Sequence, residues 1–183
     1  ERATGKSIDQ YTEEKLWKPL GAASNAFWSL DKRNGNEKAF CCMYATARDY
    51  ALIGQLILNE GEWNGQQLVP KWYMKQMVET PKMKTKEKVP NMRYGWHIWV
   101  YKNHGNPVYY CRGLMGQYMI AIPHKNRVIV RLGTKRDDHY AIPENKMNDL
   151  AYRSANDEKY GHTNDLYHYL NMSDRIVAQI DKK

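Results

Sequence analysis

The sequence predicts an α+β protein in which helices pack on an antiparallel sheet and a further helix ends the chain. Two observations carry this prediction. Amphipathic helical patterns dominate the part of the chain before residue 80. Four apolar runs follow, at residues 94–101, 108–112, 117–123 and 128–132, and short polar connections separate them. This order is typical of a meander, in which each strand pairs with the next along the chain.

Residues suited to helix starts predict three helices before the sheet. Ser7 is expected to cap the first helix, with Gln10 completing a capping box three residues later. Thr46 is expected to cap the second helix, with Asp49 at its third position. A third, shorter helix begins at Pro70, because proline suits the first turn of a helix.

Turns and a terminal helix complete the predicted fold. Glycine and asparagine predict tight turns at residues 31–35 and 63–65. A short helix is expected near residues 145–153, and Thr163 or Asn164 is expected to cap the last helix. The apolar residues on one face of that last helix are Leu166, Tyr169, Leu170, Ile176, Val177 and Ile180.

Size and composition indicate a folded protein with one substantial core. A chain of 183 residues is expected to form one domain, and a hydrophobic content of 42% excludes a disordered protein. The aromatic residues are 14 Tyr and 6 Trp but only 2 Phe. Because Tyr and Trp favour half-buried positions with one polar atom exposed, this bias suits clefts and interfaces.

The charge and cysteine content set limits on partners. The net charge of +8 raises non-specific affinity for acidic polymers, and the lysines between Pro81 and Pro90 are expected to lie on a solvated loop. The three cysteines are Cys41, Cys42 and Cys111, and neighbouring cysteines rarely pair, so at most one ordinary disulfide is expected. No run approaches the roughly 18 apolar residues of a membrane span.

The run Tyr109–Pro123 holds the most informative feature, a Gly-Leu-Met-Gly kink between two apolar strands. Gly113 and Gly116 each weaken a strand, because glycine loses more entropy on folding and has no side chain to pack. A strand tolerates such residues where a ligand or another backbone must come close. We therefore expect this strand to border a site.

Other patterns that suggest chemistry are weaker. Ser29 and Lys32 have the Ser-x-x-Lys spacing, but the pair runs into a turn instead of a helix, which favours coincidence. The six histidines lack the spacing of a metal site, and no phosphate-binding loop is present. Cys111 is expected to be a small buried hydrophobic residue instead of a nucleophile. No cofactor is implied.

Several short motifs follow one another in a fixed order over residues 1 to about 135. They are Ala3–Ser7, Leu16–Gly21, Ala45–Asp49, Gly54–Leu56, Gly61–Gly65, Tyr94–Trp96 and Gly113–Gln117. Together they resemble the serine β-lactamase and penicillin-binding-protein-like hydrolases. The resemblance is greatest to the branch of class C β-lactamases, esterases and 6-aminohexanoate-dimer hydrolases.

The resemblance implies a β-lactamase/transpeptidase-like fold and acyl transfer by a serine, a lysine and a tyrosine, with two backbone N–H groups holding the oxyanion. In the family, the serine-lysine and tyrosine motifs precede the helix with which this chain begins. Residues 1–183 are therefore expected to be the C-terminal part of one such domain, inactive alone. The missing N-terminal segment is then a partner, and the location is expected to be periplasmic or extracytoplasmic.

The resemblance also implies where the site lies. The third family motif falls on Cys111, Arg112 and Gly113, of which only the glycine matches. Leu114, next to Gly113, is expected to supply an oxyanion N–H from its backbone. Cys111, Arg112 and Met115 are expected to contact the substrate, and Arg112 could meet a carboxylate with its planar fork of donors. Because the motif departs from the family's, an ester or amide is favoured over a classical β-lactam.

Two further expectations concern partners. The alternative to an enzyme is a non-catalytic module that binds an acidic polymer or a partner protein through the charge of +8. Specific nucleic-acid binding is not expected, since only the charge supports it. A missing upstream strand would leave an open sheet edge, which favours pairing with the absent segment or with a second copy of the chain.

Overall fold

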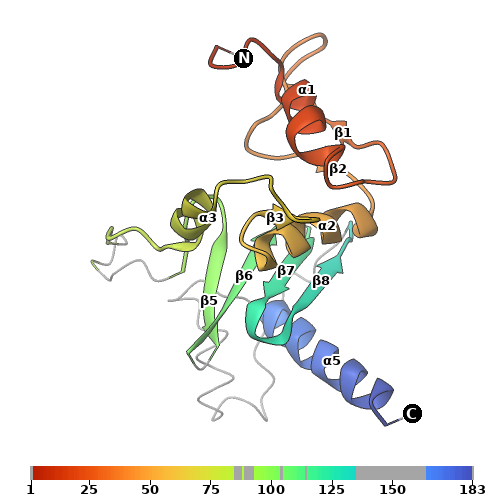
Figure 1. Cartoon of the computed structure of the whole chain (residues 1–183), viewed down its shortest axis with the longest axis vertical. Helices are drawn as coiled ribbons and strands as arrows, with labels where there is room; N and C mark the ends of the chain where they lie inside the picture. Colours follow the sequence, from red (N-terminus) through yellow and green to blue (C-terminus); the bar gives the residue numbers. More distant parts are fainter. Residues whose placement is uncertain are drawn as a thin grey trace. The chain divides into compact units, whose positions relative to one another are not determined.

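The computed structural model shown in Figure 1 has mixed α/β secondary structure with antiparallel sheets and a C-terminal helix, as predicted. The chain divides into two compact units, residues 1–74 and residues 75–183. The single domain expected over residues 1–183 stays a prediction. The structure describes residues 2–84, 88, 93–103, 105–113, 115–134 and 164–182.

The first unit combines short helices with two small hairpins. Its elements are α1 (Ile8–Thr12), which continues as the π-helical turn η1 (Glu13–Trp17), then the paired strands β1 (Phe27–Trp28) and β2 (Met43–Tyr44), helix α2 (Ala47–Leu58), and the paired strands β3 (Glu62–Trp63) and β4 (Gln66–Gln67). Helix α3 (Lys71–Val78) begins in this unit directly after Pro70, as predicted.

The start of α1 differs from the prediction. Ser7 occupies the N-cap, but its side chain caps no backbone N–H. Its hydroxyl donates to the Asp9 carboxylate, and Asp9 Oδ1 accepts from the Gln10 N–H at 2.7 Å. The predicted capping box with Gln10 is therefore wrong. A hydrogen bond to a charged carboxylate is stronger than one to a neutral amide, so Asp9 takes the serine hydroxyl.

The start of α2 confirms the prediction. The Thr46 hydroxyl accepts from the Asp49 N–H at 3.2 Å and donates to Asp49 Oδ2 at 2.7 Å. Asp49 Oδ1 also accepts from the Ala23 N–H at 2.9 Å, and the residue is only 2% exposed. The hydrogen bonds from Thr46 and Ala23 lower the pKa of the Asp49 carboxyl, although burial acts against them. Asp49 thus connects the helix start to the preceding loop.

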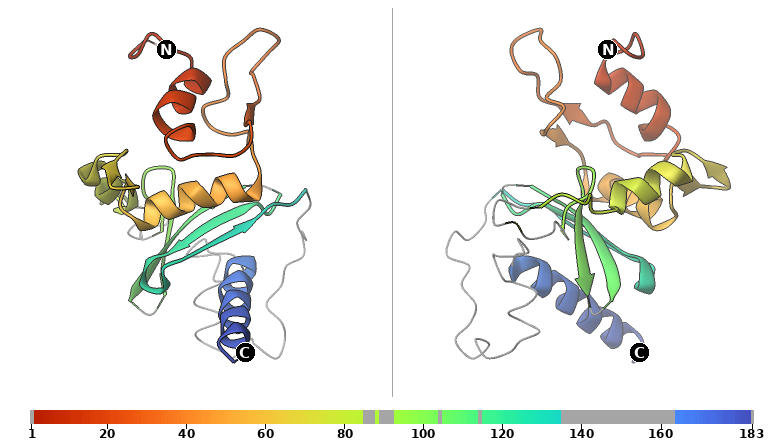
Figure 2. Two further views of the ribbon diagram at one scale, coloured as in Figure 1. Left: turned by 45° about the vertical axis from the view of Figure 1, so that its right-hand side comes forward. Right: turned by 90° about the vertical axis from the view of Figure 1, so that its left-hand side faces the viewer.

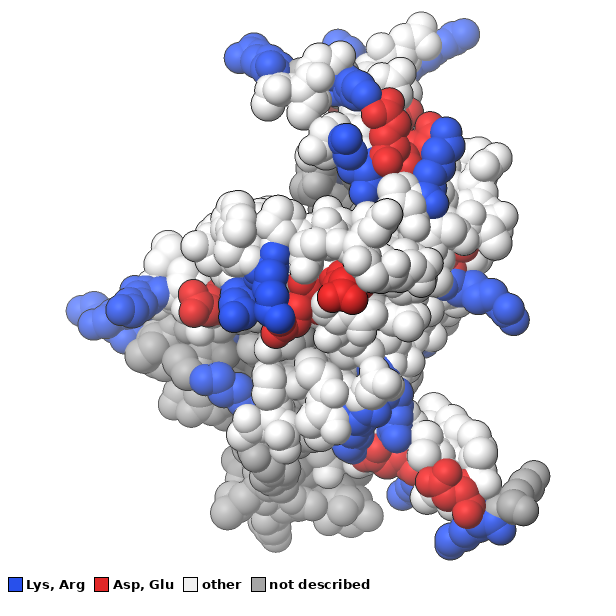
Figure 3. Space-filling view, viewed as in Figure 1, with Lys and Arg blue, Asp and Glu red and all other residues white. Residues whose placement is uncertain are grey.

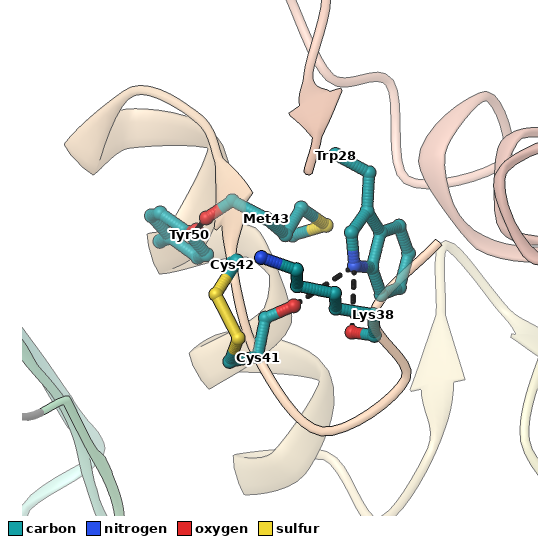
Figure 4. Close-up of a disulfide and its surroundings, with 6 residues drawn as sticks. All are labelled: Trp28, Lys38, Cys41, Cys42, Met43 and Tyr50. Atoms are coloured by element: carbon teal, nitrogen blue, oxygen red, sulfur yellow. Dashed lines mark hydrogen bonds between the residues drawn. A yellow bond between two sulfur atoms is a disulfide. The ribbon is translucent and has the colours of Figure 1, made fainter. Parts of the chain in front are cut away.

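The predicted turns are confirmed, while the cysteines depart from expectation. Asn64 and Gly65 have φ of 48° and 77° and connect β3 to β4. Asp31 Oδ1 accepts from the Asn36 N–H at 2.9 Å and closes the turn at residues 31–35. Cys41 and Cys42, which were expected not to pair, form a disulfide with each other (Figure 4).

The second unit is built on the predicted meander. Strands β5 (Trp99–Asn103), β6 (Asn106–Arg112), β7 (Tyr118–Ile122) and β8 (Arg127–Arg131) pair antiparallel in chain order, with a short 3₁₀ helix, η2 (Pro123–Lys125), between β7 and β8. The side chains of β7 are buried along its whole length, and because they alternate between the two faces, both faces of this strand are covered.

Strand β5 begins later than the apolar pattern predicts, because residues 94–98 form a turn. His97 has φ of 56°, and the Gly95 N–H donates to the Ile98 carbonyl at 2.8 Å. The Trp96 N–H donates to the Met77 carbonyl, at the end of α3, at 2.9 Å. A Cβ on Gly95 would lie 2.2 Å from the same carbonyl oxygen, so only glycine fits there.

The core of the second unit combines residues of the sheet with residues of helix α5 (Asn164–Ile180), which packs against the sheet in Figure 2. The Tyr118 hydroxyl donates to Asp165 Oδ1 at 2.8 Å inside this core, so even its polar groups are paired. The core residues are Tyr101, Val108, Tyr110, Tyr118, Ile120, Ile122, Leu166 and Leu170.

Only the first half of α5 packs as predicted. Ile176 and Ile180 share the apolar spacing of Leu166 and Leu170, yet they are 51% and 64% exposed. Beyond the core, the helix is held by ion pairs: Lys125 Nζ and an Arg127 guanidinium nitrogen each lie 2.7 Å from the Asp174 carboxylate. Burial acts to raise the pKa of Asp174, but these two partners lower it overall.

Two predictions fall outside the described residues. The short helix expected at residues 145–153 and the alternative cap Thr163 lie in the part of the chain that the structure does not describe. Lys86 of the lysine-rich loop between Pro81 and Pro90 lies there too, while Lys82, Lys84 and Lys88 are described and exposed, as predicted.

Candidate functional site

The end of β6 extends beyond the strand that pairs with it on one side. Strand β5 pairs with β6 from Asn106 to Tyr110 only. On its other side, β7 pairs with β6 as far as Arg112. Among the strands of the described residues, Cys111 and Arg112 therefore pair with β7 on one side and with no strand on the other. This open edge coincides with the predicted site.

The backbone of Gly113 shows which way this edge points. The Gly113 N–H donates to the Gln117 carbonyl at 2.9 Å, and the Gly113 carbonyl accepts from the Gly116 N–H at 3.2 Å. Both polar groups of Gly113 thus point toward the start of β7. Because successive residues of a strand direct these groups to opposite sides, those of Arg112 point toward the open edge.

The side chains of Gln117, just before β7, and Arg131, in β8, hold the kink in place. Gln117 Oε1 accepts from the Met115 N–H at 3.0 Å, and Gln117 Nε2 donates to the Gly133 carbonyl at 2.7 Å. The Arg131 guanidinium donates to the Met115 carbonyl at 3.2 Å and the Gly116 carbonyl at 2.6 Å. The sequence indicates Gln117 only as part of a motif and does not indicate Arg131, since no local pattern connects a residue of β8 to this turn.

The close approach expected at Gly113 is made by the chain itself. A Cβ on Gly113 would lie 2.4 Å from Gln117 Oε1 and 3.1 Å from the Gln117 Cβ. Any larger residue would displace the side chain that holds the kink. The glycine was expected to make room for a ligand or a backbone, but the group it accommodates here is an internal side chain.

The predicted site residues share one strand end but do not all face one way. Cys111 is exposed, so the prediction of a buried position for it is wrong; Arg112 and Gly113 are half-buried, and Met115 is 44% exposed. Desolvation of the sulfur by the surrounding protein raises the pKa of the Cys111 thiol to about 11, which disfavours the nucleophilic thiolate at neutral pH. Leu114 lies outside the described residues.

Strand alternation separates the side chains of Cys111 and Arg112. Arg112 lies two residues after Tyr110, which is buried in the core beneath the sheet. Cys111 lies two residues after Tyr109, on the opposite face. Because alternate residues share a face, a ligand lying on one face can meet only one of these two side chains.

An open cavity of about 780 Å³ is lined by Tyr109, on the strand face that Cys111 shares, although Cys111 itself does not line it. Its wall combines aromatic and basic side chains with one acidic group. The residues that define its character are Trp96, Tyr109, Lys82, Lys102 and Glu79. A cavity of this size can accept a small molecule with apolar and anionic parts.

The described residues contain no group of three His, Cys, Asp or Glu side chains placed to hold a metal ion. None of the helices in the described part of the chain is both long and apolar enough to cross a membrane. Figure 3 shows basic and acidic side chains interspersed on the face it presents. Ion pairs such as Lys6–Glu14 and Lys71–Glu60 account for part of this mixture.

Comparisons with known proteins show what this chain is similar to. The family model described as Beta-lactamase matches residues 1–152. A solved structure described as "Putative 6-aminohexanoate-dimer hydrolase from Bacillus anthracis" has a TM-score of 0.66 and 27% sequence identity. The match covers 87% of this chain but 41% of that chain, so the present chain spans less than half of its length. No curated protein matches.

Proposed function

This chain belongs to the Beta-lactamase family, and we propose that it supplies the oxyanion strand and one cleft wall of a serine hydrolase. The reaction is acyl transfer from an ester, an amide or a β-lactam, by a serine nucleophile with lysine and tyrosine as proton carriers. Those three residues lie in a segment that precedes the motifs of this chain. The observation that carries the proposal is the open edge of β6 at Cys111 and Arg112.

The oxyanion N–H is assigned to Leu114. The N–H groups of its described neighbours support this assignment, because they already have partners within the chain. Those of Gly113 and Met115 donate to Gln117, and that of Gly116 donates to Gly113. A preorganised N–H stabilises the negative oxygen of the tetrahedral intermediate without having to reorient during the reaction.

We propose that the substrate lies on the face of Cys111. The cavity is lined by Tyr109, which shares that face, and its lysines can attract an anionic part of the acyl or leaving group. The Arg112 side chain alternates to the opposite face, so the arginine contributes its edge-facing backbone groups. Met115, exposed at the kink, is assigned to the rim of the site.

The test uses the chain joined to its upstream segment and p-nitrophenyl acetate as substrate. Leu114→Pro removes the N–H and is expected to lower kcat by about 10²- to 10³-fold. Leu114→Ala keeps the N–H and is the matched control, expected to retain most of the activity. The proposal fails if the proline variant keeps the activity of the alanine variant. It also fails if the isolated chain turns over the ester faster than its own Leu114→Pro variant.

The alternative of a non-catalytic module for an acidic polymer or a protein partner draws on the net charge of +8. Nothing in the described residues favours this binding module over the hydrolase. Three expectations remain predictions. They are the pairing of a second copy of the chain at the sheet edge, an extracytoplasmic location and the absence of specific nucleic-acid binding.

A further inference from the structure

The disulfide between Cys41 and Cys42 closes a small ring made of two side chains and the peptide bond between them (Figure 4). It lies just before β2, at the end of the loop that begins after β1. Both cysteines are half-buried, so a small reductant can reach the ring. Nothing in the proposed hydrolase mechanism uses this pair.

Hydrogen bonds connect the ring to the base of its loop. The Cys41 carbonyl accepts from Trp28 Nε1 at 2.9 Å, and the Cys42 carbonyl accepts from the Ser29 N–H at 3.0 Å. The Cys41 N–H donates to the Lys38 carbonyl at 3.1 Å, and Trp28 Nε1 also donates to that carbonyl at 3.1 Å. Figure 4 shows the indole nitrogen between its two acceptors. The peptide groups of the ring thus anchor the loop.

The backbone of Cys42 has φ of 77°, in the left-handed region that side chains other than glycine rarely adopt. Reduction would remove the covalent ring that constrains Cys42 in this region, where its Cβ crowds the backbone. Leaving this region would turn the Cys42 carbonyl away from the Ser29 N–H. The state of the disulfide is therefore coupled to the order of residues 29–42.

We propose that Cys41–Cys42 is a reversible thiol–disulfide modification site whose oxidation state sets the order of the 29–42 loop. The reductant is a dithiol. One of its thiolates attacks a ring sulfur, the S–S bond breaks, and a mixed disulfide forms. Its second thiol displaces the protein sulfur and closes a disulfide on the reductant. The protein gains two electrons and two protons as two thiols.

Peptide mapping tests the chemistry. Trypsin, which cuts after Lys38 and Arg48, releases both cysteines in peptide 39–48, while Cys111 lies in peptide 103–112. Without reductant, peptide 39–48 is expected to resist iodoacetamide and to lack both thiol hydrogens. After dithiothreitol it is expected to take two labels, and oxidised glutathione is expected to restore the ring. Labelling of either cysteine in protein kept free of reductant would overturn the proposal.

Amide hydrogen exchange tests the coupling. Reduction is expected to speed exchange at Ser29 and Cys41 by about tenfold, since each amide donates one hydrogen bond near the ring. The Asn59 N–H, which donates to the Gln55 carbonyl at the end of α2, is the internal control and is expected to keep its rate. Equal exchange in both oxidation states would refute the coupling.

A matched pair of variants tests the indole anchor. Trp28→Phe removes the donor to both carbonyls and is expected to speed reduction by dithiothreitol by about tenfold. Trp72→Phe alters a tryptophan that is 62% exposed and distant in sequence, and it is expected to leave the rate unchanged. Equal rates in the two variants would show that Trp28 does not hold the ring, which contradicts the coupling.

Discussion

Gln117 organises the candidate site at the scale of the single residue. Its backbone carbonyl accepts from the N–H of Gly113. In its side-chain amide, the oxygen accepts from the N–H of Met115 and the nitrogen donates to the carbonyl of Gly133. One residue thus fixes both sides of the kink and joins it to the end of β8. Gly113 must be glycine because Gln117 occupies the space of its Cβ.

Replacing Gln117 by alanine is expected to lower both stability and turnover. The variant loses two side-chain hydrogen bonds to the backbone, which corresponds to about 1–3 kcal/mol of unfolding free energy. Gln67→Ala is the control, since Gln67 Nε2 also donates to two backbone carbonyls, those of Glu60 at 2.9 Å and Val69 at 2.7 Å. Urea unfolding should show a similar loss of unfolding free energy for both variants.

Turnover of the ester by the chain joined to its upstream segment distinguishes the two glutamines. Only Gln117→Ala is expected to reduce kcat, because only Gln117 holds the strand end beside Leu114. If both variants lost turnover in proportion to stability, Gln117 would have a structural role without positioning the site.

The start of α2 shows how a single carboxylate stabilises a whole element. Asp49 accepts from the Thr46 hydroxyl and from the Ala23 N–H, so it holds the helix start and the preceding loop together. Tyr50 adds a second connection, because its hydroxyl donates to the Met43 carbonyl of β2 at 2.6 Å. The helix is therefore fixed to the hairpin that carries the disulfide loop.

The stability that Asp49 provides is expected to depend on pH. Its folded pKa lies below the ordinary value of 3.8, so the ionised form stabilises the folded state. That contribution is complete above the unfolded pKa of about 4 and is lost as the pH falls through the folded pKa. Asp49→Asn is expected to cost about 1–3 kcal/mol at pH 7 and less at about pH 3.

Urea unfolding at the two pH values measures this difference. Asp181→Asn, at an exposed position after α5, is the control and is expected to change stability little at either pH. A loss for Asp49→Asn that is the same at both pH values would show that the carboxylate charge is not the source of the stability.

At the scale of the whole molecule, the net charge of +8 does not imply a nucleic-acid site. Basic side chains pair with acidic ones, as in Lys18–Glu13 and Lys125–Asp174. Such pairs reduce the number of cations available to bind phosphates. We therefore expect acidic polymers to be bound by scattered, unspecific contacts.

Binding of heparin and of DNA is expected to be weak and to vanish together at moderate salt. The reason is that each phosphate or sulfate contact releases counterions, so affinity falls as salt rises. Titration of both polymers at increasing salt concentration measures this. Retention of one polymer at a salt concentration that releases the other would instead indicate a specific site and would favour the binding-module alternative.

Local patterns were enough to predict much of the fold. The strands at residues 108–112 and 117–123, the turn at residues 63–65 and the cap Thr46 all depend on residues that are close in sequence. Where two local signals competed, the prediction failed. Ser7 had both Asp9 and Gln10 within reach, and the charged partner took its hydroxyl.

The sequence by itself determined the meander, the helix starts and the placement of the candidate site at the Gly113 kink, since periodicity and turn residues act over a few positions. Only the tertiary structure decided what surrounds that kink. Arg131 reaches the Gly116 carbonyl from another strand, and the open edge at Arg112 exists because β5 pairs no further than Tyr110. These are contacts between distant segments, which no local pattern encodes.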